Sequence, residues 1–442
     1  MLLRQVNCRS DLKKIEYIYL FVLRLPRLFK QNSLIFFQVG FSLLFCVTAL
    51  SCNRGIAPNV LRFSHFWSEP GQRAVMDSVI ADFKKENPDI QVEVSELSWS
   101  DGKTKLMINF NAETAPDVIE FGSDWIPEFS ASGVLEDISN VSSLKSRFDS
   151  TPEYSRAPGV WQNKSYALPW FVDTRVLFVN RNLAAKVVGA DSNTVDLTSW
   201  DKMYQLGEKI NKLADVKGIG VNGSDAHRLY KKLLPQFWSN GGEILDKNGN
   251  PSFATKENIE ALTFYVKQLD VGVLETQKNL DDLFKRGKLG ILYSGAWLLK
   301  PLAKADFQWY CVPFPGNNGH PGVSFAGGEY LSINARSSMK SQAEKLVAFL
   351  SRPDNELRLA KAFNIFPADC SLQRDSFYLN RNQGNILIEQ LKNARMTPVH
   401  PKWLEIEMIL EDEVAQALYK RKTSAEAMRS ADTRVTELIA EP

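Results

Sequence analysis

Hydrophobic and polar residues alternate with two different periods in the first part of the chain beyond residue 58. Residues 60–67 form a hydrophobic run typical of a strand, and residues 72–85 repeat hydrophobic side chains at helical spacing until Asn87-Pro88 ends the pattern. A strand at 90–94, a helix at 103–112 and a short buried strand at 117–121 follow. This order of strands and helices predicts a parallel sheet with helices on its faces, and therefore an α/β fold.

Open sheets of this kind bind ligands beyond the carboxyl ends of their strands, so residues directly after each predicted strand are the first candidates for a site. They are Trp67 and Glu69 after the first strand, Trp99 after the second, and Ser123, Asp124 and Trp125 after the third.

The rest of the chain continues the α/β pattern and then becomes mainly helical. Helical periodicity is present at residues 200–213, 230–240, 256–269 and 280–286, and in the last third at 343–350, 356–363 and 401–438 with short breaks. We find no internal repeat and no low-complexity tract. A chain of 442 residues with this pattern is long enough for two domains.

The first 51 residues read as an export signal. A basic segment ends at Lys30, residues 34–51 carry no charge, and Cys52 follows. This pattern resembles a lipoprotein signal in which Cys52 becomes the acylated first residue, although Ala49 and Leu50 fit the usual box imperfectly. An ordinary cleaved signal and an uncleaved membrane anchor are the alternatives, and all three predict that the remainder is exported.

Charge and composition exclude several functions. The chain has 53 Lys and Arg and 51 Asp and Glu; removing the seven basic and two acidic residues of 1–51 leaves 46 and 49. This remainder has no basic stripe for a phosphate backbone, so we expect no nucleic-acid partner. Beyond Cys52, Cys311 and Cys370 have no CxxC spacing, and either a disulfide between them or two free thiols fits the sequence.

Several segments together resemble family 1 of the extracellular solute-binding proteins, the group that includes the maltose-binding protein. They appear in the family's order: Phe66-Trp67, 115–125 (APDVIEFGSDW), 132–139 (SGVLEDIS), 163–183 (NKSYALPWFVDTRVLFVNRNL), 237–245 (FWSNGGEIL), 284–297 (FKRGKLGILYSGAW), 312–316 (VPFPG), 327–333 (GGEYLSI) and 422–435 (KTSAEAMRSADTRV). No single segment is specific, but their order covers most of the chain after residue 60.

The resemblance implies a type II periplasmic-binding-protein-like fold, in which two discontinuous α/β lobes close around a hinged ligand cleft. We expect an N-terminal lobe of residues 58–170 with 326–397 and a C-terminal lobe of 171–325 with 398–442, after a leader of 1–51. The chain would cross between the lobes near 171–175, 324–328 and 396–400, where Pro169, Pro398 and Gly327-Gly328 suit segments that bend.

A sugar presents an apolar ring face and an edge of hydroxyls, so its receptor needs flat aromatic side chains and polar groups at fixed angles. By resemblance, six tryptophans fall where the family has its cleft: Trp67, Trp125, Trp170, Trp238, Trp297 and Trp403. Small residues before Trp297, including Gly295, leave room for a sugar ring. Carboxylates accept hydrogen bonds from two hydroxyls, and the candidates are Asp124, Asp173, Glu69 and Glu329, with Arg175 either binding ligand or orienting Asp173.

Two motifs point elsewhere but lack their required context. Residues 218–223 (GIGVNG) match the dinucleotide-binding GxGxxG pattern, and Glu243 lies where a ribose-binding acid would. The preceding segment is polar and helical where a strand is required, so we interpret the motif as a turn between a helix and a strand. The four histidines are scattered and have no metal-ligand spacing. We therefore expect no cofactor and no metal.

The sequence thus predicts an exported sugar or oligosaccharide receptor of an ABC importer, acting as a monomer with membrane permeases and an ATPase, and not an enzyme. The location would be periplasmic or at the cell surface, with a lipid anchor on Cys52. An exported glycosidase is one alternative, because it too combines tryptophans with two carboxylates. A receptor for another solute such as a glycerol phosphate is the second, although only Arg175 and Arg62 offer cations near the expected cleft.

Overall fold

In the computed structural model, residues 60–99, 101–189, 195–223, 225, 227–380 and 383–441 are described, and their elements belong to one compact unit, Asn59–Pro442. The export signal and Cys52 lie outside the described residues. The main sheet has the strand order β2-β1-β3-β11-β6-β9-β7-β8, and β10, β12 and β13 pair at its sides.

The first part of the sheet is parallel, as the hydrophobic pattern predicts. Strand β1 (Val60–His65) pairs in parallel with both β2 (Gln91–Glu96) and β3 (Val118–Gly122). The helices between them are α3 (Pro70–Glu86) and α4 (Gly102–Asn111). Helix α3 buries Met76, Val79, Ile80 and Phe83, so the predicted helical face is the one that packs against the sheet.

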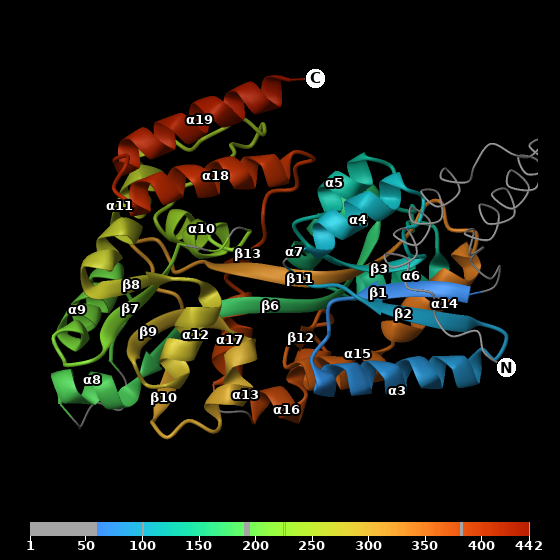
Figure 1. Ribbon diagram of the computed structural model, residues 1–442, viewed down its shortest axis with the longest axis horizontal. Coiled ribbons are helices and arrows are strands. Elements are labelled where there is room, and N and C mark those ends of the chain that lie inside the picture. Colours follow the sequence, from blue (N-terminus) through green and yellow to red (C-terminus); the bar gives the residue numbers. More distant parts are fainter. Residues whose placement is uncertain are drawn as a thin grey trace, which may run out of the picture. The chain divides into compact units, whose positions relative to one another are not determined.

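Two long strands run through the middle of the sheet and join its two parts (Figure 1). Strand β6 (Ala167–Asn180) pairs antiparallel with β11 (Ser324–Ile333) up to Thr174, and with β9 (Leu289–Gly295) from Arg175 onward. All 14 residues of β6 are buried. Burial on both faces explains why the hydrophobic residues of this strand do not alternate with polar ones, although Asp173, Thr174 and Arg175 interrupt them.

The second part of the sheet shows that the interpretation of residues 218–223 as a turn is wrong. Residues 218–223 are not a turn, because β7 (Lys217–Asn222) is a strand that pairs in parallel with β8 (Gly272–Glu275) and β9. The glycines serve close packing: a Cβ on Gly218 would lie 2.0 Å from the carbonyl oxygen of Gly207. The motif therefore matches the sequence pattern GxGxxG, but these residues do not form a phosphate-binding loop.

Helices cover this second part and close the chain. The helical periodicities of the sequence correspond to α9 (Trp200–Asn211), α10 (Tyr230–Ser239), α11 (Lys256–Lys267), α12 (Gln277–Lys285), α14 (Lys340–Leu350), α15 (Pro353–Phe363), α18 (Trp403–Leu418) and α19 (Ser424–Ala440).

The shorter helices are α5 (Ile126–Ala131), α6 (Ser142–Asp149), α7 (Glu153–Arg156), α8 (Arg181–Val188), α13 (Leu299–Leu302), α16 (Ser376–Leu379) and α17 (Gly384–Leu391). The remaining strands are β4 (Val160–Trp161), β5 (Lys164–Ser165), β10 (Trp309–Val312), β12 (Phe366–Pro367) and β13 (Ala394–Arg395).

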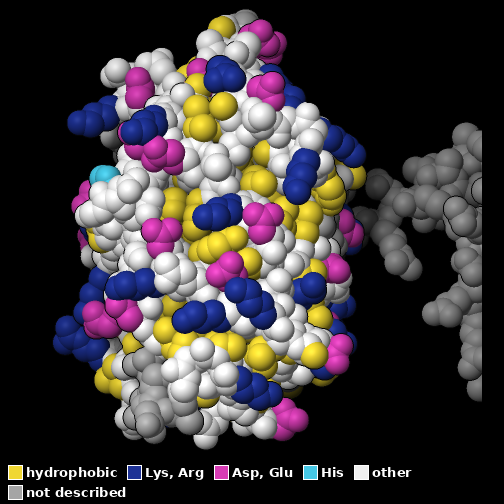
Figure 2. Space-filling model, turned by 90° about the vertical axis from the view of Figure 1, so that its left-hand side faces the viewer, with side chains coloured by type: hydrophobic (Ala, Val, Ile, Leu, Met, Phe, Trp, Pro, Cys, Tyr) yellow, Lys and Arg dark blue, Asp and Glu magenta, His cyan; other side chains and the backbone are white. Residues whose placement is uncertain are grey.

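The structure also decides the state of the two cysteines in the described residues. Cys311 is buried, Cys370 is exposed, and both are free thiols, so the disulfide alternative is wrong. No described helix is both long and apolar enough to span a bilayer. On the face that Figure 2 shows, Lys and Arg are interspersed with Asp and Glu among scattered hydrophobic side chains.

Candidate functional site

A pocket of about 580 Å³ lies where β6 and β11 pass from one part of the sheet to the other. Its walls come from the loop after β3, from α10 and α12, from the turn after β9, and from the loop after α15. A volume of this size is typical of small-molecule sites. Nine of the predicted site residues line it: Trp67, Trp99, Ser123, Asp124, Trp125, Asp173, Arg175, Trp297 and Glu329.

Trp67, Trp99 and Trp125 supply the aromatic surface on the side of β1, β2 and β3. The ring of Trp67 stacks on Phe363 with centroids 4.1 Å apart, and that of Trp99 stacks on Phe66 at 4.0 Å. Trp99 is 39% exposed, an unusual exposure for an indole. These stacks restrict the orientations of the Trp67 and Trp99 rings.

Trp297 faces the pocket from the opposite part of the sheet, and its orientation is fixed. Its Nε1 donates a hydrogen bond to Asp281 Oδ2 at 2.9 Å. A Cβ on Gly295 would lie 2.1 Å from the indole ring, so only glycine fits beneath it. Gly295 thus shapes the site from below the ring and does not itself line the pocket.

Asp124 links the two parts of the molecule across the pocket. It follows β3, yet its Oδ2 accepts a hydrogen bond from the Tyr230 hydroxyl of α10 at 2.9 Å, and Lys231 Nζ lies 3.7 Å from the same oxygen. One carboxylate oxygen is therefore engaged by the opposite wall.

Several buried polar atoms beside the pocket have no hydrogen-bond partner among the described residues. They are Asp173 Oδ1, Arg175 Nε and Nη1, and Glu329 Oε2. The Asp173 and Arg175 side chains lie 3.6 Å apart, which is an ion pair without a direct hydrogen bond. Buried polar groups are almost always paired in proteins, so these atoms are candidates for contact with a bound ligand.

The pKa values of these acids follow from their burial. Burial raises the pKa of Asp173, although the charges of Arg175 and Lys232 act in the opposite direction. Burial, together with the nearby charges of Glu120 and Asp173, raises the pKa of Glu329 well above its usual range. Burial thus favours the neutral form of Glu329, which can donate a hydrogen bond as well as accept one.

Glu120 in β3 gives a testable pH dependence. It is fully buried, accepts a hydrogen bond from Phe66 N at 2.9 Å, and burial raises its pKa to about 8. The folded protein therefore keeps this proton up to about pH 8, whereas the unfolded chain releases it near pH 4.5. Each pH unit between these values costs the wild type about 1.4 kcal/mol through this group.

We expect Glu120→Gln, which keeps the acceptor but carries no titrating proton, to gain stability relative to the wild type as pH rises from 5 to 8. Urea unfolding at each pH measures the difference in the free energy of unfolding. At pH 4.5 and below both side chains are neutral, which provides the internal control. Parallel stability curves for the two proteins would contradict the assignment.

Four predicted residues do not line the pocket. Glu69 is exposed at the N-terminus of α3, where its backbone N–H donates to Gln72 Oε1. Trp238 is 5% exposed beneath the guanidinium of Arg395, Trp403 is 1% exposed against Tyr230, and Gly295 lies under Trp297. Trp170, named with the tryptophans, is fully buried in β6. These indoles pack the core, because their segments face inward.

The pocket also holds residues that the sequence did not single out. Its cations are Arg175, Arg228, Lys231, Lys232, Lys278 and Lys285, of which only Arg175 was predicted. Arg62, the other predicted cation, instead donates to the carbonyls of Thr114 and Ala115 away from the pocket. The adjacent Lys231 and Lys232 at the start of α10 are the sequence feature that could have indicated these cations. A helical pattern, however, does not reveal which face of the helix lies at a cleft.

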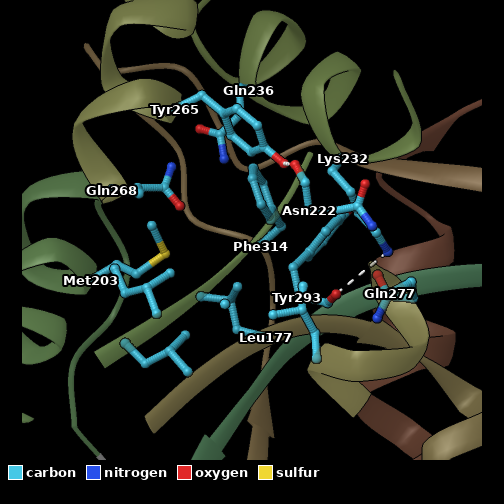
Figure 3. Close-up of a pocket in the computed structure, with 14 residues that line it drawn as sticks. Leu177, Met203, Asn222, Lys232, Gln236, Tyr265, Gln268, Gln277, Tyr293 and Phe314 are labelled. Carbon is cyan, nitrogen blue, oxygen red and sulfur yellow. Dashed lines mark hydrogen bonds between the residues drawn. The ribbon is translucent and has the colours of Figure 1, made fainter. Parts of the chain in front are cut away.

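A second cavity of about 20 Å³ lies behind Lys232 and Gln277, which line both spaces (Figure 3). Side-chain amides of Asn222, Gln236 and Gln268 point into it. This volume is about that of one water molecule, so the cavity is too small for a sugar ring. Among the described residues, no group of three or more His, Cys, Asp or Glu side chains is placed to hold a metal ion.

Comparisons with known proteins agree with this geometry. Residues 67–357 match the family model described as bacterial extracellular solute-binding protein. The chain is 26% identical over 341 residues to a diacetylchitobiose binding protein of Streptomyces coelicolor, covering 72% of this chain and 75% of that protein. It is 24% identical to a galactooligosaccharide-binding protein of Bacillus subtilis, covering 77% and 80%.

Solved structures share the fold. The GacH receptor of Streptomyces glaucescens, whose structures include a complex with acarbose, superposes with a TM-score of 0.77 at 18% identity. The superposition covers 87% of this chain and 99% of the receptor. The predicted α/β fold with two lobes is thereby confirmed.

Proposed function

Since this chain belongs to the bacterial extracellular solute-binding protein family, we propose that it binds a sugar or oligosaccharide outside the cytoplasm and delivers it to the permeases of an ABC importer. The proposal makes the chain a receptor and not an enzyme, in line with its family. Relatives named for diacetylchitobiose and galactooligosaccharide binding support a saccharide.

The observation that carries the proposal is the combination of ring surfaces and unpartnered polar atoms in one pocket. Trp67, Trp99 and Trp297 offer flat apolar faces, while Asp173 Oδ1 and Glu329 Oε2 lack partners. A pyranose needs both, because its faces are apolar and its edge carries hydroxyls. The main proposal is therefore favoured over a glycerol phosphate, which has no ring to stack.

The lobes that close on the ligand are proposed from the strand pairing. We place the boundary at residues 170 and 171, with 58–170 and 326–397 in one lobe and 171–325 and 398–442 in the other. The support is that β6 changes partner from β11 to β9 between Thr174 and Arg175, four residues after this boundary. The hydrogen bond from Tyr230 to Asp124 then connects the two lobes, and closure would place the ligand between them.

Membership of the family implies that the protein is exported. Its attachment to the membrane by a lipid anchor is a separate proposal. We propose that Cys52 is acylated and holds the receptor at the membrane beside its permeases and ATPase, with the receptor acting as a monomer. An uncharacterized lipoprotein of Streptomyces antibioticus is 26% identical over 408 residues and supports this anchor. We expect fatty-acid label to enter the wild type but not Cys52→Ser when each is expressed in a bacterium that processes lipoproteins; label in both would contradict it.

We expect a saccharide ligand to raise the melting temperature, since a ligand present at 100 times its Kd stabilises the folded state by about 2.7 kcal/mol. Thermal unfolding with mono- to tetrasaccharides measures the shift, and chromatography after overnight incubation tests for turnover. Intact sugar and a raised melting temperature support a receptor. Shortened sugars would indicate a glycosidase, and a shift with phosphorylated solutes alone would overturn the saccharide.

A further inference from the structure

The cations of the pocket all come from one wall, formed by β6, α10 and α12. Arg175 and Lys232 are buried at the base of the pocket, Lys231 and Lys285 are half-buried, and Arg228 and Lys278 are exposed at its mouth. The tryptophans Trp67, Trp99 and Trp125 lie on the other wall. Trp297 lies on the side of the cations, within 5.5 Å of Arg175 and 5.8 Å of Lys232, so aromatic rings are present on both sides of the pocket.

The outer cations of this wall have carboxylate neighbours. Lys285 pairs with Asp282 at 2.5 Å, and Lys231 lies 3.7 Å from Asp124. Partly exposed pairs of this kind contribute little to binding by themselves, because water and salt screen them. Arg175 and Lys232 form the inner pair, which differs from these outer cations because both side chains are buried.

Arg175 and Lys232 are held in place without full use of their hydrogen-bond donors. Arg175 lies with its guanidinium carbon 4.8 Å from the ring centre of Phe325, and its Nε and Nη1 have no hydrogen-bond partner. Lys232 Nζ has one hydrogen bond, to the Tyr293 carbonyl at 3.4 Å, and no described carboxylate lies within 4.0 Å of it. Two buried basic side chains that line the same pocket thus keep unused hydrogen-bond donors.

Two acids lie near this pair. Asp173 Oδ2 is 3.6 Å from Arg175 Nη1, but burial raises the pKa of Asp173 and so disfavours its charged form. Asp281 already accepts hydrogen bonds from Trp297, Gln277 and Ser294. Burial and the neighbouring charge of Arg175 lower the pKa of Lys232 well below its usual range. An anion placed between the two cations would reverse part of that effect, because an opposite charge favours the protonated amine.

We infer that the ligand is an acidic saccharide whose carboxylate lies against Arg175 and Lys232 while its ring stacks on the tryptophans. This inference rests on the proposed function and narrows its ligand class. A carboxylate suits the base of the pocket better than a phosphate monoester, which carries a charge of about −1.5 to −2 and would lie beside Asp173 and Asp281. Arginine also recognises carboxylates with defined geometry.

The test is calorimetric titration with matched pairs of saccharides. Uronate di- and trisaccharides built from galacturonate, glucuronate or mannuronate are each compared with the neutral oligosaccharide of the same linkage, and inorganic phosphate is titrated alone. We expect one acidic member to bind at least tenfold more tightly than its neutral partner. Its affinity should fall as salt rises, because the bond is ionic.

Two variants test whether Lys232 contacts the carboxylate of the ligand. Lys232→Met keeps the buried volume without the amine, so we expect it to fold and to lose at least tenfold more affinity for the acidic member than for the neutral one. Lys212→Met, at an exposed lysine beyond α9, should match the wild type for both. Equal losses for the acidic and neutral members would overturn the inference.

The outcomes separate the inference from the proposed function. Neutral saccharides binding as tightly as uronates would overturn the acidic ligand and leave the sugar receptor intact. Phosphate binding more tightly than any uronate would overturn the carboxylate. If no saccharide of either class bound, the proposed function itself would fail.

Discussion

Replacing Arg147 by methionine is expected to lower the free energy of unfolding by about 3–5 kcal/mol. Arg147 extends from α6 and donates to Glu356 Oε2 at 2.6 Å and to Asp369 Oδ2 at 3.1 Å. Glu356 is 1% exposed, so the substitution leaves a buried carboxylate without its cation. Unfolding in urea followed by circular dichroism measures the loss.

The loss should shrink at acidic pH. Burial raises the pKa of Glu356 to about 7 even with Arg147 beside it. Removing Arg147 raises this pKa further, and below it the variant holds a neutral acid that needs no cation. We therefore expect a smaller difference from the wild type at pH 5 than at pH 8.

Arg352→Met is the matched control. Arg352 pairs with Glu86 at 2.8 Å, but both side chains are about half exposed. Exposed pairs contribute about 0–1 kcal/mol, so this variant should stay close to the wild type. Equal losses in the two variants would show that burial of the Arg147 network has no special effect.

Replacing Trp297 by alanine is expected to weaken saccharide binding about 10- to 100-fold, or about 1.4–2.8 kcal/mol. Trp297 is half-buried at the pocket, and its hydrogen bond to Asp281 and the close approach of Gly295 hold the ring in one orientation. Alanine removes the ring surface on which a sugar would stack. Titration calorimetry with a saccharide identified by thermal shift measures the loss.

Two variants separate stacking from folding. Trp297→Phe retains an aromatic face but loses the hydrogen bond to Asp281, so we expect an intermediate affinity. Trp309→Phe lies in the same part of the molecule but lines a different groove and should bind as the wild type does. Full affinity in Trp297→Ala with an unchanged melting temperature would remove Trp297 from the site.

A large share of the pocket could be predicted from the sequence by selecting the residues that directly follow each predicted strand. Trp67, Trp99, Asp124 and Trp125 follow predicted strands and line the pocket, because the carboxyl ends of parallel strands meet at one edge. The basic residues of α10 and α12 could not be predicted in this way. A lysine on an amphipathic helix has the same pattern whether it faces water or a cleft, so its position depends on how the helix docks.

Tertiary packing also decided which tryptophans are available. The sequence names both Trp297 and Trp403 as site candidates, but Trp403 is 1% exposed against Tyr230 and Trp297 faces the pocket. The same holds for residues 218–223, whose glycines allow a helix to approach strand β7. Such contacts join segments that are far apart in the chain.

The sequence by itself determined the periodic helices, the parallel strands β1, β2 and β3, and the family, because these depend on local spacing and on the order of segments. Only the tertiary structure decided that Arg175 and Lys232 line the same pocket with unused donors, and that Trp238 and Trp403 belong to the core. The reason is physical: burial and unmet hydrogen bonds arise from packing between distant segments, and no local pattern records them.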